Sequence, residues 1–219
     1  MRGERAMNHA HTKDNTLIKI CGVSDHAAAE FAARAGADFV GVVLVESSPR
    51  FVPPALAIEL ARTIRNAGAI PVAVIQLPID DATRAALSAF AVIQFHGVET
   101  PSDVAPFAQT HPQCELWKGL HFSTQTCTEW MNSGHVQRLV VDGMDPGSGA
   151  SFDHRLLSAL DDNTRARCLL AGGLDATNVA QSLSVARVSG VDVSSGVESS
   201  RGVKDQGMIR AFIDAVRRA

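Results

Sequence analysis

The feature that most constrains the fold is an alternation of short β-branched runs with longer alanine-rich segments, which continues from residue 17 to the end of the chain. Short apolar runs predict buried strands, and the segments between them have the spacing of amphipathic helices. Eight runs occur, at Leu17–Ile20, Phe39–Val45, Ile70–Ile75, Ala91–Phe95, Cys114–Trp117, Arg138–Val141, Cys168–Leu170 and Val188–Val193. Helices with Asp or Pro at their starts, as helix N-termini favour, are expected at 25–35, 53–66, 81–89, 175–183 and 205–218.

Two α/β architectures fit this alternation, a closed barrel and an open doubly wound sheet. The units repeat roughly every 25 residues, which suits a compact barrel. An open sheet gathers its functional residues near one switch point, whereas a barrel brings the C-terminal end of every strand to one mouth. Unusual polar and glycine residues follow strands along the whole chain, at Cys21, 47–50, His96, Asp142, 172–173 and 194–196. We therefore expect a single-domain α/β protein with an eight-fold (β/α) TIM barrel over residues 17–219.

Composition supports one domain and a small-molecule partner. The chain has 219 residues, of which 46% are hydrophobic and 20% charged, enough to bury one sizeable core. A formal net charge of −3 provides no broad basic field for nucleic acid. Residues 1–16 are polar and are expected to form a flexible N-terminal extension, and His9 and His11 within it are read as part of that extension rather than as metal ligands.

The same sequence predicts a cytoplasmic protein without a membrane segment. The N-terminal residues lack the apolar stretch of a signal peptide, and no later run is long enough to cross a bilayer. Four scattered cysteines lack the spacing of a metal site, so no metal is expected and reduced thiols are favoured. The 147–149 Gly-Ser-Gly turn lacks the fingerprint of a dinucleotide site, so no organic cofactor is expected.

Two glycine-bearing turns near the C-terminus predict a phosphate site. One turn follows the seventh strand and the other follows the eighth, the positions where barrel enzymes frequently bind phosphate. Glycines let backbone N–H groups approach an anion closely. The alternative is that these glycines only permit tight turns. On the phosphate interpretation, the ligand is a small phosphorylated molecule held by Gly172, Gly173, Ser194, Ser195 and Gly196.

Cys21 and Asp142 are the candidate catalytic pair. Cys21 ends the first strand, where a thiol with a lowered pKa can act as a base or nucleophile, although such a cysteine also fits a small buried hydrophobe. Asp142 ends the sixth strand, where its carboxyl group is able to transfer a proton or simply to cap a turn before Gly143. Together the two residues suggest acid–base chemistry at the barrel mouth.

Arg50 and His96 are candidate binding residues in loops after the second and fourth strands. The guanidinium of Arg50 is suited to gripping a carboxylate through two hydrogen bonds, although a solvated surface arginine is the alternative. His96 fits either a residue of the mouth or a turn histidine. Lys19 and Lys118 also lie near strand ends, but their spacing identifies no role.

Six ordered motifs resemble the phosphoribosylanthranilate isomerases of tryptophan biosynthesis, from about Leu17 to Arg217. The motifs are Lys-Ile-Cys-Gly at 19–22, Gly-Ala-Asp-Phe-Val-Gly at 36–41, Ser-Pro-Arg-Phe-Val at 48–52, Gln-Phe-His-Gly at 94–97, Ala-Gly-Gly-Leu at 171–174 and Val-Asp-Val-Ser-Ser-Gly-Val-Glu at 191–198. The resemblance implies isomerisation of N-(5-phosphoribosyl)anthranilate to 1-(2-carboxyphenylamino)-1-deoxyribulose 5-phosphate, an Amadori rearrangement that needs no metal or organic cofactor.

The resemblance also implies a role for each matching residue. Cys21 is the expected general base, Asp142 the general acid and Arg50 the anchor for the anthranilate carboxylate, while the two glycine turns hold phosphate and Asp192 lies close to the sugar. The chain departs from the family at Gly143, where Ser or Thr commonly follows the acid.

Two other functions remain open at this point. A related barrel isomerase of the histidine pathway acts on a substrate with two phosphates and usually relies on paired carboxylates, but the first strand carries no Asp in that position. A catalytically silent phosphate-binding barrel would keep the glycine turns, but the presence of both Cys21 and Asp142 argues against it. The sequence is compatible with a monomer or a homodimer.

Overall fold

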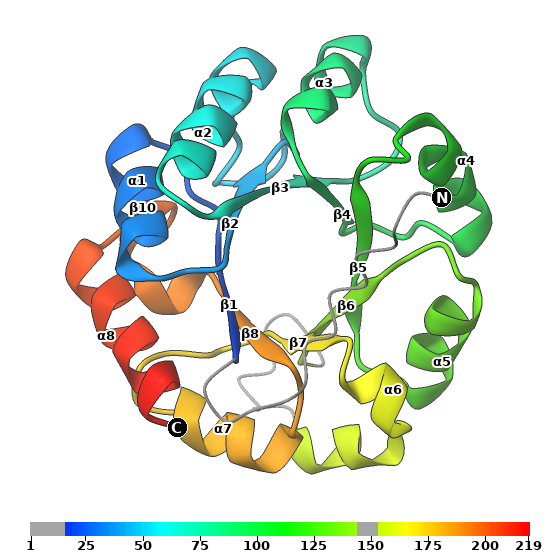
Figure 1. Cartoon of the computed structure of the whole chain (residues 1–219), viewed down its shortest axis with the longest axis vertical. Coiled ribbons are helices and arrows are strands. Elements are labelled where there is room, and N and C mark those ends of the chain that lie inside the picture. The colour runs from blue at the N-terminus through cyan, green and yellow to red at the C-terminus, as the bar shows by residue number, and fades with distance from the viewer. Residues whose placement is uncertain (1–15, 144–152) are drawn as a thin grey trace, which may run out of the picture.

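Eight parallel strands close into a barrel in the order in which they occur in the chain (Figure 1). The computed structural model describes residues 16–143 and 153–219. The barrel strands are β1 Leu17–Cys21, β2 Phe39–Val43, β3 Ile70–Ile75, β4 Val92–Phe95, β5 Glu115–His121, β6 Arg138–Asp142, β7 Cys168–Leu170 and β8 Gly190–Val193. Closure comes from parallel pairing of β1 with β8, which aligns Ile18 with Val191. The predicted (β/α) barrel is confirmed, and the open doubly wound sheet is wrong.

Helices surround the barrel on its outer face (Figure 1). They are α1 His26–Ala35, α2 Pro54–Asn66, α3 Asp81–Ala86, α4 Pro101–Thr110, α5 Thr124–Asn132, α6 Asp162–Arg165, α7 Val179–Ala186 and α8 Gln206–Arg218, with short 3-10 segments η1 Leu87–Ala89, η2 His154–Ala159 and η3 Ser195–Val197. Asp25 and Asp205 cap the first and last helices by accepting hydrogen bonds from backbone N–H groups, as their position in the sequence predicted.

One predicted helix begins later than expected. The sequence pattern placed a helix at 175–183, but α7 begins at Val179. The side chain of Asp175 accepts hydrogen bonds from the backbone N–H groups of Thr177 and Asn178, at 2.7 and 3.1 Å. These N–H groups would have no partner within the first turn of a helix, so the side chain of Asp175 bonds them as a cap does. Asn178 has a φ of −113°, and regular helix begins only after it, at Val179.

Alternating side chains fill the inside of the barrel and leave space at its mouth. Phe39 and Trp117 meet edge to face inside the barrel, with ring centroids 4.7 Å apart. Gly41 and Gly119 occupy positions where a larger residue would collide with the candidate site. A Cβ at Gly41 would lie 2.9 Å from Cys21 Sγ, and a Cβ at Gly119 would lie 2.1 Å from His96 Nδ1.

A small antiparallel hairpin separates the last barrel strand from the last helix. It consists of β9 Glu198–Ser200 and β10 Val203–Lys204. Gly202, in the turn of the hairpin, has a φ of +85°, and a Cβ there would lie 2.8 Å from the carbonyl oxygen of Pro49. Glycine therefore lets the hairpin approach the loop after β2 closely.

Two sequence predictions lie outside the described residues. Of the predicted N-terminal extension, which includes His9 and His11, only Thr16 is described, and the Gly-Ser-Gly turn at 147–149 is not described. Within the described ranges, no helix has the length and apolar character needed to cross a membrane.

Candidate active site

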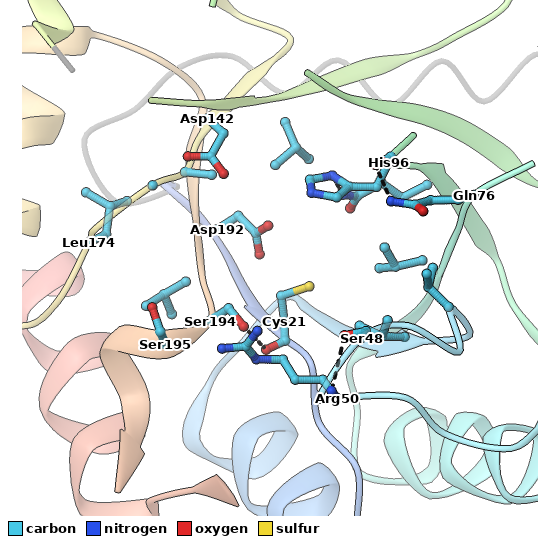
Figure 2. Close-up of a pocket in the computed structure, with 18 of the residues that line it drawn as sticks. Cys21, Ser48, Arg50, Gln76, His96, Asp142, Leu174, Asp192, Ser194 and Ser195 are labelled. Atoms are coloured by element: carbon cyan, nitrogen blue, oxygen red, sulfur yellow. Dashed lines mark hydrogen bonds between the residues drawn. The ribbon is translucent and has the colours of Figure 1, made fainter. Parts of the chain in front are cut away.

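A cavity of about 480 Å³ opens at the C-terminal ends of the barrel strands (Figure 2). It brings together most of the candidate site residues from six strand ends: Cys21, Arg50, His96, Asp142, Gly172, Gly173, Asp192, Ser194 and Ser195 all line it. Gly196 is not among the lining residues. A Cβ at Gly196 would lie 1.9 Å from the carbonyl oxygen of Leu174, so this glycine allows the loops after β7 and β8 to pack together.

A buried ion pair lies beside the thiol of Cys21. Lys19 Nζ donates a hydrogen bond to Asp192 Oδ1 at 2.9 Å, and the Lys19 side chain is fully buried. Lys19 and Cys21 point into the barrel from alternate positions of β1, and both side chains converge on the space above Gly41. In Figure 2, Asp192 lies between Cys21 and Asp142. The thiol of Cys21 and the carboxyl groups of Asp142 and Asp192 therefore line the cavity, and the Lys19 ammonium lies buried beneath them.

The protonation of these groups is coupled. Burial raises the pKa of the Cys21 thiol, and the Lys19 ammonium only partly opposes this rise. Burial therefore opposes the thiolate form that a general base requires. Burial also raises the pKa of Asp192, again against the effect of Lys19. For Lys19, burial acts to lower the pKa, but the negative charges of Asp192 and Cys21 outweigh it and the pKa is raised.

Asp142 and His96 line the cavity from β6 and from the end of β4. Asp142 is half-buried and lies against Gly172, where a Cβ would meet Asp142 Oδ1. His96 lies within electrostatic reach of Asp142 and Asp192. The protein crowded around the imidazole lowers the pKa of His96, and the Lys19 ammonium adds to this effect. A neutral imidazole is therefore favoured at neutral pH.

The loops after β7 and β8 form one wall of the cavity. Gly172 and Gly173 both have positive φ, at +86° and +61°. No described atom lies within 4 Å of the position of a Cβ on Gly173, so the backbone is open on this side. Ser194 and Ser195 border the cavity beside them, at the start of η3. The arrangement presents backbone and hydroxyl groups to the same space and suits an anion.

Arg50 lines the cavity from the loop after β2, and a second residue holds its side chain. Arg50 Nε and Nη2 donate to the two carboxylate oxygens of Glu198, at 2.6 and 2.9 Å. This pairing was not predicted from the sequence, although Glu198 ends the motif at 191–198. Gly22 makes room for the arginine, because a Cβ there would lie 2.3 Å from Arg50 Cδ.

Comparisons with known proteins decide the family. A family model described as N-(5'-phosphoribosyl)anthranilate isomerase matches residues 18–215. The isomerase of Azorhizobium caulinodans is 39% identical over 92% of both chains, and that of Zymomonas mobilis subsp. mobilis is 36% identical over 91% of this chain and 97% of its own. The chain belongs to the phosphoribosylanthranilate isomerase family.

Solved structures of the phosphoribosylanthranilate isomerase family share this fold. The enzyme of Thermotoga maritima superposes with a TM-score of 0.80 at 28% identity, covering 93% of this chain and all of its own. A family structure in complex with reduced 1-(o-carboxyphenylamino)-1-deoxyribulose 5-phosphate has a TM-score of 0.79 at 26% identity, with the same coverage. The Thermotoga maritima enzyme is described as dimeric, and monomers generated from it have also been solved.

Several polar residues of this phosphoribosylanthranilate isomerase family site were missed in the sequence. Gln76 and Gln94 line the cavity, and the buried Oε1 of Gln94 has no hydrogen-bond partner among the described residues. Gln94 belongs to a quoted motif, and a polar residue inside an apolar strand was the available signal. Glu198 also ends a motif, at 191–198, whereas Lys204 lies outside all six; the partners of both residues come from other segments and could not be read from the sequence. Within the described chain, no cluster of His, Cys, Asp and Glu has the arrangement of a metal site.

Proposed function

We propose that this chain catalyses the Amadori rearrangement of N-(5'-phosphoribosyl)anthranilate to 1-(2-carboxyphenylamino)-1-deoxyribulose 5-phosphate. The observation that carries the proposal is the common cavity, which is lined by Cys21, Asp142, an open glycine loop and Arg50. The substrate has an anionic group at each end, a phosphate and a carboxylate. The glycine loop suits the phosphate, and the guanidinium suits the carboxylate.

The proposed reaction needs only proton transfers between these groups and the substrate. Asp142, as the general acid, protonates the furanose ring oxygen, and the C1'–O bond breaks to give a cationic imine. This cation acidifies the neighbouring C2'–H bond, and Cys21 removes that proton as the general base. The resulting enolamine takes up a proton at C1' while its C2' hydroxyl gives up a proton, which yields the ketose. Two protons enter and two leave, so no atom is gained or lost overall.

Lys19 and Asp192 support this chemistry from below the sugar. The raised pKa of Cys21 favours the protonated thiol in the free enzyme. When Cys21 loses its proton, the Lys19 ammonium stabilises the thiolate. Asp192 accepts the hydrogen bond of the buried Lys19 ammonium, and it also lines the cavity in which the sugar hydroxyls are proposed to bind. His96 and Ser194 are proposed as further polar contacts to the substrate.

A turnover assay tests the proposal. The unstable substrate is generated in situ from anthranilate and phosphoribosyl pyrophosphate, and the loss of its fluorescence is followed with purified protein. Asp142→Asn keeps the size and polarity of the side chain but removes the acid, so kcat should fall by about 10²–10⁴-fold. Binding of the reduced product analogue should change little, because the loss is specific to the transition state.

A matched control separates this effect from a general change of charge. Asp162→Asn removes a carboxylate at an exposed position in α6, away from the cavity-lining residues, and should leave turnover unchanged. A wild-type protein without turnover would contradict the proposed function and leave a silent phosphate-binding barrel. An Asp142→Asn variant with near-normal kcat would instead require a different proton donor.

We propose further that the enzyme acts on its small phosphorylated substrate in the cytoplasm, as a monomer or a homodimer. The Thermotoga maritima relative, dimeric but also solved as generated monomers, supports both states. Sedimentation velocity of the purified chain distinguishes them.

A further inference from the structure

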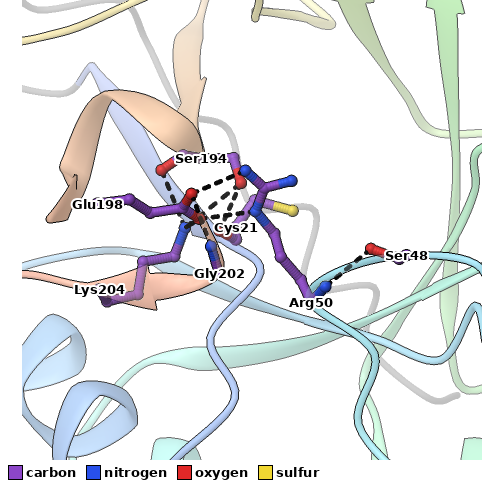
Figure 3. A network of polar contacts seen from close by, with 7 residues as sticks. All are labelled: Cys21, Ser48, Arg50, Ser194, Glu198, Gly202 and Lys204. Atoms are coloured by element: carbon purple, nitrogen blue, oxygen red, sulfur yellow. Dashed lines mark hydrogen bonds and ion pairs between the residues drawn. The ribbon is translucent and has the colours of Figure 1, made fainter. Parts of the chain in front are cut away.

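Arg50 is one member of a cluster of three charged side chains, which we call the carboxylate-side triad and define as Arg50, Glu198 and Lys204 (Figure 3). Glu198 lies at its centre. Its carboxylate accepts two hydrogen bonds from Arg50, one from Lys204 Nζ at 2.7 Å and one from the backbone N–H of Gly202 at 3.1 Å. The Lys204 side chain is fully buried and that of Glu198 nearly so, which makes this a built feature of the fold rather than a surface pair.

The triad leaves one edge of the Arg50 guanidinium available. A guanidinium has two edges that can each bind a carboxylate through paired N–H groups, Nε with one terminal nitrogen and the two terminal nitrogens together. Glu198 occupies the first edge. Nη1 makes no hydrogen bond to the described part of the chain. Arg50 lines the cavity whereas Glu198 does not, so Glu198 holds the guanidinium from behind.

Charge balance gives Lys204 a separate role. Glu198 is ionised at neutral pH, because hydrogen bonds from Arg50, Lys204 and Gly202 outweigh the effect of burial and lower its pKa to about 2. A pair of Arg50 and Glu198 alone would be neutral, and a carboxylate arriving at Arg50 would also feel the negative charge behind it. Burial lowers the pKa of Lys204, and its contact with Glu198 opposes that effect and favours the ammonium. The Lys204 ammonium is a second positive charge, so the triad as a whole then carries one net positive charge.

The triad is also tied to the rest of the site. Lys204 Nζ donates to the carbonyl oxygen of Ser194 at 2.9 Å, and Ser194 Oγ donates to the carbonyl oxygen of Cys21 at 3.1 Å. The same lysine therefore fixes the hairpin against the loop after β8. Movement of the hairpin would displace Arg50 relative to Cys21.

We propose that Glu198 and Lys204 are positioning residues for the known reaction of this family: Glu198 orients the Arg50 guanidinium toward the substrate carboxylate, and Lys204 cancels the charge of Glu198 so that the site still attracts an anion. This proposal rests on the proposed function, since it takes the anthranilate carboxylate as the group that Arg50 binds. Neither residue touches the substrate, and both act through Arg50.

The experiment measures binding of two product analogues by titration calorimetry. One is reduced 1-(o-carboxyphenylamino)-1-deoxyribulose 5-phosphate, and the other is the same compound without the carboxylate. Lys204→Met should weaken binding of the carboxylated analogue roughly ten- to a hundredfold, the range of a lost charge-assisted interaction. The analogue without a carboxylate should bind as in the wild type, which also shows that the cavity is intact. KM should rise by a similar factor while kcat stays within about threefold.

A double variant separates the charge argument from a purely structural role. Glu198→Gln keeps the size of the side chain and one oxygen that can accept a hydrogen bond from Arg50. Combined with Lys204→Met, it again leaves one net positive charge, on Arg50 alone. The double variant should bind the carboxylated analogue several-fold more tightly than Lys204→Met. If both residues had only structural roles, the two losses of binding free energy would add and the double variant would bind more weakly. Lys204→Arg should keep both affinities. Arg217→Met, which removes an arginine paired with Asp38, is the matched control and should change neither affinity.

The outcomes are distinct from those of the function test. Equal weakening of both analogues by Lys204→Met, or a double variant that binds no better than Lys204→Met, would overturn the proposal. Lys204→Arg tests the role of the charge when Lys204→Met does not fold, because it keeps the positive charge. A folded Lys204→Arg protein that no longer prefers the carboxylated analogue would also contradict the proposal. Failure of the proposed function would appear earlier, as a wild-type protein without turnover of the authentic substrate.

Discussion

Gly41→Ala should slow catalysis by displacing the thiol of Cys21 without removing any functional group. Gly41 lies on β2 beside β1, and its φ is not in the left-handed region, so alanine fits its backbone. The added methyl group would lie 2.9 Å from Cys21 Sγ and 3.3 Å from Lys19 Cε. Favourable contacts between non-bonded carbon atoms are about 3.5–4.0 Å long, and sulfur is larger, so the thiol must move by roughly half an ångström or more.

The size of the effect follows from that displacement. A misplacement of about 1 Å in a reacting group costs on the order of 10²-fold in rate, so a shift of half that size predicts a loss of about tenfold in kcat. Binding of the reduced product analogue should change less, because Arg50 and the glycine loop lie away from the new methyl group. The thermal unfolding midpoint should fall slightly, because a small group is forced into a packed region.

The assay is the fluorescence-based turnover measurement, with the unfolding midpoint measured on the same samples. Gly207→Ala is the control, since its Cβ would meet only Asp205 Oδ1, at 3.1 Å, in the first turn of α8. It should leave kcat unchanged. A folded Gly41→Ala enzyme with wild-type kcat would refute the reasoning, because the position of Cys21 would then not limit the reaction.

Three further predictions concern the two anion sites and the triad. Arg50→Ala should cost about 1.5–3 kcal/mol of binding free energy for the carboxylated analogue and almost nothing for the analogue without a carboxylate, as measured by calorimetry. Gly173→Ala should raise the inhibition constant of inorganic phosphate in the turnover assay, since its methyl group enters open space beside the cavity, while the αL backbone costs only roughly 1–2 kcal/mol of stability. Wild-type protein should lose more stability than Glu198→Gln as the pH falls. The folded-state pKa of Glu198 is lowered from 4.5 to about 2, so its stabilisation is present above the unfolded-state pKa and is lost as the pH falls toward 2. Urea unfolding at several pH values measures the free energy of unfolding of both proteins. The same dependence on pH in wild type and Glu198→Gln would contradict the prediction.

The sequence predicted the barrel well because its signal is local. Each strand is a short apolar run, and each helix start at Asp25 or Asp205 is a capping residue followed by an amphipathic segment. Asp175 is the informative failure. Its side chain bonds the N–H groups of Thr177 and Asn178 as a cap would, but Asn178 has a φ of −113° and regular helix starts only at Val179, which the residue types do not reveal.

The candidate site was predicted as a set of positions rather than as a set of interactions. The rule that strand ends share one mouth was enough to bring Cys21 and Asp142 to one cavity. The ion pair of Lys19 with Asp192 joins residues that are 173 positions apart, and the contact of Arg50 with Glu198 spans 148. Such partners depend on the register of the closed barrel. The direction of the Cys21 pKa shift depends on burial, which sequence position does not reveal.

The ion pair between Lys19 and Asp192 also links catalysis to the order in which the chain is made. Lys19 is on the first barrel strand and Asp192 on the last. The ribosome therefore adds Asp192 only after the first seven strands have been synthesised. A lysine buried without its partner is strongly disfavoured. The first strand therefore has no stable place inside a partly made barrel, and we expect the nascent protein to remain inactive until β8 docks. Assembly of the enzyme and assembly of its reaction centre are then a single late event.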